Sequence, residues 1–193
     1  MKLLKSKISK YILLLLLPVF LHSVEYDKKY LKELEKLTTE QKEVLYLAYS
    51  AGAEKGYGLT LAAIAWKESQ FGKFMLNITD GKYGSYGPYH VLLDHVLIRH
   101  KVTSNWGKSR LAEKLLYDME FSSSEALDVL TYYHDRFKNK DNPWRWAVAA
   151  YNNGNKALTT DKGKKYAEDI ALRVVTLKQY FTKHKILLKV VKN

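Results

Sequence analysis

The chain contains 193 residues, 47% of them hydrophobic, which is enough apolar material to build the core of one domain. It has no cysteine, which excludes disulfide bonds, thiolate zinc sites and a lipid anchor on cysteine. The formal net charge of +12 favours anionic partners such as nucleic acid, a membrane surface or bacterial cell wall.

The N-terminal segment has the pattern of a secretory signal peptide, residues 1–23. Residues 1–10 carry four lysines and no acidic residue, residues 11–21 are an apolar run, and Ser23 is a small residue at a plausible cleavage site. The run is shorter than the roughly 20 residues that span a bilayer, although the cleavage pattern is imperfect and leaves an uncleaved membrane anchor as the alternative. We therefore expect a periplasmic or secreted protein whose residues 24–193 form one domain, without stable membrane insertion.

Removal of the signal peptide would leave 28 basic and 20 acidic residues, a net charge of +8. Export argues against nucleic acid as the partner of these charges. The sequence also lacks the interleaved aromatic and basic residues that single-strand binders use. Most lysines are instead spread along predicted helices, where they form solvated faces. We expect no nucleic-acid binding.

The first part of the mature chain predicts helices that support a site rather than form one. Residues 24–36 are charged and carry a narrow apolar stripe. Thr38 and Gln41 have the spacing of a capping box, which predicts a helix that continues to about Ala53. A glycine-containing turn follows at residues 55–58. None of these segments carries an obvious chemical motif.

Glu68 lies near the end of the next predicted helix, in an unusual position for a carboxyl group. Leu61, Ile64 and Glu68 fall on one stripe, because residues three and four apart share a helix face. Gly72 is placed to end this helix as a left-handed cap. Burial disfavours a charged carboxylate and favours its protonated form, which a general acid needs. The alternative is a Glu68 exposed where the helix frays, or paired with a neighbouring lysine.

The segment from Asn77 to Tyr89 has the composition of a loop and contains three tyrosines. Its glycines, asparagine, aspartate and proline are typical turn residues. Tyrosine rings stack well on sugar rings, and glycine lets a ligand approach the backbone closely. The alternative is a surface loop whose tyrosines fold back onto the core.

The rest of the chain predicts further helices, with no strand pattern of any length. Helical spacing recurs over residues 91–102, 109–119 and 162–183, and Ser122 to Glu125 has the form of a second capping box. An alanine-rich helix at residues 144–154 is suited to close packing at the centre and ends in polar groups. We therefore predict an all-α domain.

Three histidines in this region do not predict a metal site. His90, His95 and His100 recur every five residues, which puts neighbours about 140° apart on a helix. Side chains spaced in this way do not converge on one metal ion. The zinc motif His-Glu-x-x-His is also absent from the sequence. We expect neither a metal nor a cofactor.

Three motifs together resemble the lysozyme-like lytic transglycosylases of the soluble type, the SLT family, which is grouped with goose-type lysozymes. Residues 68–72 (Glu-Ser-Gln-Phe-Gly) resemble the segment around that family's single catalytic acid. Residues 85–90 (Ser-Tyr-Gly-Pro-Tyr-His) resemble its Ser-x-Gly-x-x-Gln loop, and residues 149–154 (Ala-Ala-Tyr-Asn-Asn-Gly) resemble its Ala-Ala-Tyr-Asn-x-Gly motif. Tyr166 stands where the family often has a further tyrosine. The similar region covers residues 46–181.

The resemblance implies a lysozyme-like helical fold and a site for peptidoglycan glycan strands. It implies Glu68 as the catalytic acid. His90 departs from the pattern, since the family usually has a sugar-binding glutamine there. Histidine also donates and accepts hydrogen bonds, so the departure predicts altered specificity or pH response, or else a weakened enzyme. The residues that the resemblance assigns to substrate binding are Ser69, Ser85, Gly87, Tyr89, His90, Tyr151, Asn152 and Tyr166.

The implied reaction cleaves the β-1,4 bond between N-acetylmuramic acid and N-acetylglucosamine. In this family Glu68 would protonate the leaving oxygen and then, as a base, deprotonate the muramyl C6 hydroxyl, which closes a 1,6-anhydro ring. Two alternatives stay open: a hydrolytic muramidase, for which Asp80 and Asp94 are candidate second carboxylates, and a wall-binding module without activity. The sequence does not identify a secretion-apparatus partner or another biological setting.

Overall fold

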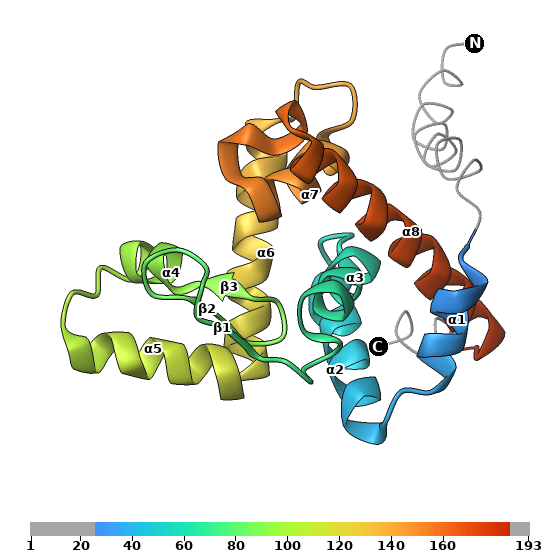
Figure 1. Ribbon diagram of the computed structural model, residues 1–193, viewed down its shortest axis with the longest axis horizontal. Coiled ribbons are helices and arrows are strands. Elements are labelled where there is room, and N and C mark those ends of the chain that lie inside the picture. The colour runs from blue at the N-terminus through green and yellow to red at the C-terminus, as the bar shows by residue number, and fades with distance from the viewer. Residues whose placement is uncertain (1–25, 186–193) are drawn as a thin grey trace, which may run out of the picture.

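The computed structural model describes residues 26–185, which fold into helices around one hydrophobic core, with a small sheet at one side (Figure 1). The predicted signal peptide, residues 1–23, lies outside the described residues. No helix between residues 26 and 185 is long and apolar enough to cross a membrane. The elements are α1 (Lys28–Glu35), α2 (Thr39–Ala53), α3 (Gly58–Ser69), β1 (Leu76–Asn77), β2 (Ser85–Tyr86), β3 (Val91–Leu92), α4 (Leu93–Arg99), α5 (Asn105–Tyr117), α6 (Met119–Arg136), α7 (Pro143–Asn153), the 3₁₀ helix η1 (Gly154–Thr159) and α8 (Asp161–Lys183).

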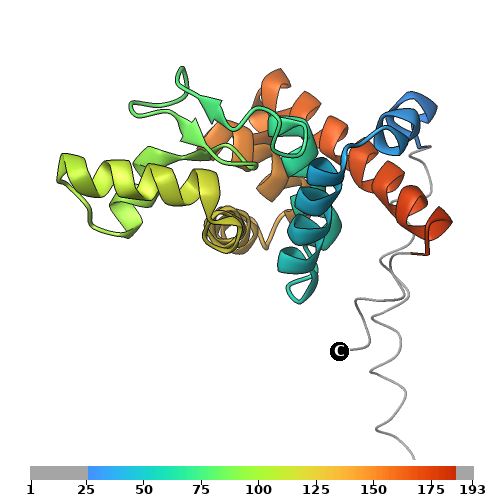
Figure 2. The same cartoon turned by 90° about the horizontal axis from the view of Figure 1, so that it is seen from below.

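Helix α6 divides the molecule into two parts. The sheet, α4 and α5 lie on one side of it, and α1, α2, α3 and α8 lie on the other (Figure 1). Figure 2 gives the same division from below, with α6 seen end-on between α5 and the pair α2 and α3. Helix α3 packs against α2, α6 and α8, and α7 packs against α6 and α8. The loop that holds the sheet therefore leaves the end of α3 and crosses to the far side of α6.

Helix α3 is the most deeply buried helix of the core, as its apolar sequence predicts. Every residue from Leu61 to Ala65 is fully buried. Helix α7 also brings small side chains inside, since all residues from Ala147 to Ala150 are at most 1% exposed. Small side chains let helices approach closely, and α7 contacts both α6 and α8. The ends of α3 and α7 are thereby held at fixed positions.

Three short strands lie in and directly beside the predicted loop from Asn77 to Tyr89, which corrects the expectation of a chain without strands and of a helix that begins at residue 91. The sheet is antiparallel with the order β1-β2-β3, and Leu76 pairs with Tyr86 while Ser85 pairs with Leu92. Each strand has only two residues. A period of two cannot be detected in two residues, so the strands form through pairing across the turns rather than through local pattern. The all-α class is unaffected.

Two helix starts differ in how well the sequence predicts them. The capping box of α2 is confirmed, because Gln41 N–H donates to the Thr38 hydroxyl and Thr38 N–H donates to the Gln41 side chain. The second predicted capping box, Ser122 to Glu125, is wrong. Helix α6 begins at Met119, and the Asp118 carboxylate accepts a hydrogen bond of 2.9 Å from the Phe121 N–H. Helix α5 also begins earlier than predicted, at Asn105.

Replacing Asp118 by alanine is expected to lower the free energy of unfolding by about 1 kcal/mol, because the first turn of α6 loses its capping acceptor. Denaturant unfolding followed by circular dichroism measures this change. Ser122→Ala is the matched control, since the buried Ser122 hydroxyl has no hydrogen-bond partner among residues 26–185. The control is expected to leave stability nearly unchanged. A larger loss in Ser122→Ala than in Asp118→Ala would contradict the assigned cap.

Candidate active site

Glu68 lies in the last turn of α3, where the buried stripe reaches the surface. The expected burial of Leu61 and Ile64 on that stripe is confirmed, and the Glu68 side chain keeps 17% of its surface exposed. The helix ends at Ser69 rather than near Gly72, with Gln70 in the left-handed conformation at φ 51°. The chain turns early because the Phe71 N–H bonds back to the Ala65 carbonyl oxygen.

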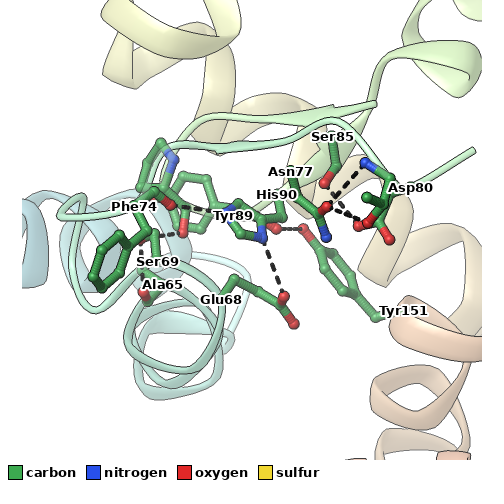
Figure 3. Close-up of polar contacts among 12 residues, drawn as sticks. Ala65, Glu68, Ser69, Phe74, Asn77, Asp80, Ser85, Tyr89, His90 and Tyr151 are labelled. Carbon is green, nitrogen blue, oxygen red and sulfur yellow. Dashed lines mark hydrogen bonds and ion pairs between the residues drawn. The ribbon is translucent and has the colours of Figure 1, made fainter. Parts of the chain in front are cut away.

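The Glu68 carboxylate is held between two side chains from distant parts of the sequence. The Tyr166 hydroxyl of α8 donates a hydrogen bond of 2.5 Å to Glu68 Oε1. On the other side, His90 Nδ1 lies 3.5 Å from Glu68 Oε2, and Figure 3 shows the two side chains pointing toward one another. Burial and then the Glu68 charge raise the pKa of Tyr166 well above its ordinary value of 10.0. Tyr166 is therefore a permanent donor at neutral pH.

A cluster of charges beside Glu68 fixes α3 against α8. Lys67 Nζ lies 2.7 Å from Asp169 Oδ2, and Arg173 pairs with the same aspartate. The Tyr30 hydroxyl of α1 donates to Asp169 at 2.7 Å. Burial alone would raise the pKa of Asp169, but the hydrogen bonds from Lys67 and Tyr30 and the Arg173 charge lower it overall. Since Asp169 follows Tyr166 by three residues on α8, this cluster also sets the position of the Tyr166 hydroxyl.

His90 occupies a strained backbone position next to the sheet. Its φ angle is +46°, in the left-handed region that residues other than glycine adopt uncommonly, although histidine, asparagine and aspartate adopt it more often than the rest. The ring is anchored at its far nitrogen, because Nε2 lies 2.8 Å from the Phe74 carbonyl oxygen. Burial acts to lower the pKa of His90, but the contact with the Glu68 carboxylate, the hydrogen bond to the Phe74 carbonyl and the charge of Asp80 raise it above 6.5.

The backbone just before His90 is clamped by side chains from two helices. The Ser69 hydroxyl of α3 lies 2.8 Å from the Pro88 carbonyl oxygen, and the Tyr151 hydroxyl of α7 donates to the Tyr89 carbonyl oxygen at 2.9 Å (Figure 3). Burial, followed by the charge of Glu68, raises the pKa of Tyr151 well above 10.0. These two contacts hold the turn so that the side chain at position 90 faces Glu68.

A family model described as the transglycosylase SLT domain matches residues 58–174, more than half of the chain. The chain belongs to this family. The matched region includes Glu68, the clamped turn, α7 and Tyr166, and it lies inside the similar region predicted from the motifs. Searches of curated proteins and of solved structures gave no match.

Membership of the SLT family gives the molecule a lysozyme-like helical fold and a lytic transglycosylase-like, peptidoglycan-related function. Within this SLT domain, the structure brings Glu68, His90, Tyr151 and Tyr166 together from four segments. Asn152 follows Tyr151 near the end of α7 and is partly buried. Folding therefore brings the three sequence motifs together around the carboxyl group of Glu68.

Several residues assigned to substrate binding have structural contacts in this SLT domain. The fully buried Ser69 hydroxyl contacts the Ala65 and Pro88 carbonyl oxygens and accepts the Gly72 N–H, so its hydrogen bonds are used within the protein. Tyr89 is also fully buried, with its hydroxyl 2.7 Å from the Ser123 hydroxyl, which corrects the suggestion that its ring faces a sugar.

Two further predicted residues shape the loop. The buried Ser85 hydroxyl donates to Asp80 Oδ2 at 2.9 Å, which ties the ends of the turn between β1 and β2. Gly87 has a φ angle of +78° and packs so closely on α5 that a Cβ atom would lie 2.1 Å from the Leu115 carbonyl oxygen. Both residues therefore help to fix the position of the loop.

The candidate second carboxylates are engaged in the loop. Asp80 accepts from Ser85, and Asp94 accepts from the backbone N–H groups of Lys82 and Tyr83. In the part of the chain that the structure describes, no group of three or more histidine, aspartate and glutamate side chains is arranged to hold a metal ion. Asp80 is near enough for its charge to raise the pKa of His90.

Sequence reasoning missed two contributors to the site. The Phe74 carbonyl oxygen, which anchors the His90 ring, is a backbone group and leaves no signal in the sequence. Asp169, which joins Lys67, Tyr30 and Arg173, is an acidic residue on a helix that otherwise reads as amphipathic. Its spacing of three residues from Tyr166, which puts both on one face of α8, is a signal that could have singled it out.

Proposed function

We propose that the protein is an exported lytic transglycosylase that cleaves the bond between N-acetylmuramic acid and N-acetylglucosamine in peptidoglycan and leaves 1,6-anhydro ends. What supports the proposal is the position of Glu68 between the Tyr166 hydroxyl and His90 Nδ1, within an SLT domain. A carboxyl group that is 17% exposed reaches solvent and a substrate while its orientation is fixed.

In the proposed reaction, Glu68 acts first as an acid and then as a base. The protonated carboxyl group gives its proton to the glycosidic oxygen as the bond to the sugar C1 breaks. The substrate's own N-acetyl group stabilises the cationic centre. The Glu68 carboxylate then takes the proton of the muramyl C6 hydroxyl, and that oxygen bonds to C1. The carboxyl group ends the cycle protonated, and a second carboxylate is not needed.

The decisive experiment is to incubate purified residues 24–193 with peptidoglycan and to weigh the soluble fragments by mass spectrometry. Fragments one water lighter than hydrolysis products are expected. Fragments of full hydrolysed mass would identify a muramidase and direct attention to Asp80. A folded protein that binds peptidoglycan and releases no fragments would identify a binding module.

We also propose export, with residues 1–23 as a cleaved signal peptide and a periplasmic or secreted location. The basic segment, the apolar run and the small residue before residue 24 support this, and so does a substrate that lies outside the cytoplasm. A net charge of +8 on the mature chain suits an anionic wall polymer. N-terminal sequencing of the protein from the periplasm or medium tests the cleavage.

Replacing Tyr166 by phenylalanine is expected to reduce the rate of fragment release by about tenfold, without changing the fragment masses. The variant removes the hydrogen bond to Glu68 Oε1, and a hydrogen bond to a charged group contributes roughly 1.5–3 kcal/mol. Initial rates on soluble glycan strands measure the effect. Tyr132→Phe is the matched control because the Tyr132 side chain lies on the surface. Equal rates for Tyr166→Phe and wild type would contradict the role.

A further inference from the structure

The tautomer of the neutral His90 ring can be assigned from its anchor. His90 Nε2 lies 2.8 Å from the Phe74 carbonyl oxygen, and a carbonyl oxygen only accepts hydrogen bonds. Nε2 therefore carries a hydrogen in both the neutral and the charged ring. In the neutral ring, the other nitrogen, Nδ1, is then the unprotonated one. Its lone pair faces Glu68 Oε2 at 3.5 Å.

The two oxygen atoms of the Glu68 carboxyl group also differ in their contacts. Tyr166 donates its hydroxyl hydrogen to Oε1, so Oε1 is already occupied as an acceptor. A proton on the carboxyl group is therefore favoured at Oε2, the oxygen that faces His90. Without such a proton, the carboxylate charge and the Nδ1 lone pair face one another unfavourably. One proton between the two atoms makes the contact favourable, whichever atom carries it.

The surroundings keep this proton between the two residues. The His90 and Glu68 side chains are 11% and 17% exposed, so solvent screens their interaction only in part. The facing groups are Tyr166 from α8, Tyr151 from α7 and Asp80 from the loop. Both tyrosines stay neutral because burial raises their pKa values well above 10.0. Asp80 favours a protonated His90 ring, while Lys67, Asp169 and Arg173 beside Glu68 pair with one another between α3 and α8.

We infer that Glu68 and His90 hold one proton between them as an ion pair, carried either on Oε2 or on Nδ1, so that His90 is a positioning residue that stores and orients the proton of the catalytic acid. A glutamine, which the resemblance leads one to expect at position 90, fills similar space and donates to the Phe74 carbonyl oxygen but does not titrate. The exchange of glutamine for histidine therefore adds a proton store to the site.

The proton balance of the reaction follows, and this step rests on the proposed function. Before cleavage the pair holds one shared proton, as an imidazolium beside a carboxylate or as a carboxylic acid beside a neutral ring. The O–H bond of Glu68 breaks as the proton moves to the glycosidic oxygen, which leaves the pair with none. The proton of the muramyl C6 hydroxyl then forms a new O–H bond on Glu68, and the pair again holds one.

The first test needs no substrate and no activity. In ¹⁵N-histidine-labelled protein, NMR titration is expected to give the Nε2–H tautomer for neutral His90. In Glu68→Gln, the pKa of His90 is expected to fall by about one unit or more, because the opposite charge is lost while burial remains. His95 is the internal reference, and its titration is expected to stay unchanged. An Nδ1–H tautomer in wild type, or an unchanged His90 titration in a folded Glu68→Gln, would overturn the inference.

The second test compares the pH dependence of fragment release in wild type and in His90→Gln. The alkaline limb of the wild-type profile is expected to move about one unit toward lower pH in the variant, because the stored proton is gone. A rate that falls equally at every pH, with an unmoved alkaline limb, would overturn the proton-sharing role. If wild type releases no fragments at any pH, the proposed function fails, while the NMR result still decides whether the proton is shared.

Discussion

Glu68→Gln is expected to reduce the release of fragments from peptidoglycan by about 10³-fold, the size of effect typical for loss of a general acid and base. The amide has the shape of the carboxyl group and still accepts the hydrogen bond from Tyr166, so the fold is expected to be kept. It has no proton to give to the glycosidic oxygen at neutral pH and no basic oxygen for the C6 hydroxyl. Mass spectrometry of the released fragments over a time course measures the loss.

The matched control for this variant is Glu168→Gln on α8. The Glu168 side chain is 63% exposed and pairs with Arg145 at the surface, so the same chemical change is made outside the site. The control is expected to release fragments at the wild-type rate, since an exposed ion pair contributes little to stability. Activity of Glu68→Gln within tenfold of wild type, with the melting temperature unchanged, would refute the assignment of Glu68 as the acid.

Gly87→Ala is expected to lower the free energy of unfolding by about 3 kcal/mol, which for a chain of this length lowers the melting temperature by roughly 10 °C. Two costs combine. The φ angle of +78° is strained for alanine, and the new methyl group would lie 2.1 Å from the Leu115 carbonyl oxygen and 2.7 Å from the Ser122 hydroxyl. Thermal unfolding measures the loss.

Gly56→Ala separates the two costs. Gly56 has a similar φ angle of +75°, but a Cβ atom there would have no neighbour within 4 Å. The free energy of unfolding of Gly56→Ala is expected to fall by about 1 kcal/mol, from backbone strain alone. Equal decreases in the free energy of unfolding would mean that the loop and α5 move apart at little cost to admit the new methyl group. In Gly87→Ala the activity is also expected to fall, because the displaced loop moves His90 away from Glu68.

The helical part of the fold follows from local patterns that can be seen in the sequence. The all-α class is confirmed, because apolar residues at helical spacing, such as Leu61 and Ile64, need a buried partner surface wherever they lie. The capping box at Thr38 is confirmed because both of its partners are local. The box at Ser122 was wrong because Asp118 competes for the same helix and caps it one turn earlier.

The site could be predicted only in part, since its contacts are long-range. The pairing of Glu68 with Tyr166 joins residues 98 positions apart, and only the resemblance to a family pointed to it. Ser69 and Tyr89 were assigned to substrate binding because they lie in the motifs that resemble the family's. Their full burial comes from the packing of the loop on α3 and α6, which no local pattern encodes. The roles of the remaining residues stay predictions.

The clamp on the turn before position 90 has a consequence for how such an enzyme can diversify. Ser69 and Tyr151 hold main-chain oxygen atoms, of Pro88 and Tyr89, and neither bonds the side chain at position 90. The clamp that presents this side chain therefore does not depend on its identity, as long as the residue tolerates the φ angle of +46°. The residue at position 90 can therefore change while the position of Glu68 stays the same. Under the proposed function and the inferred role of His90, variation at this single position is expected to change the pH dependence of fragment release without rebuilding the scaffold.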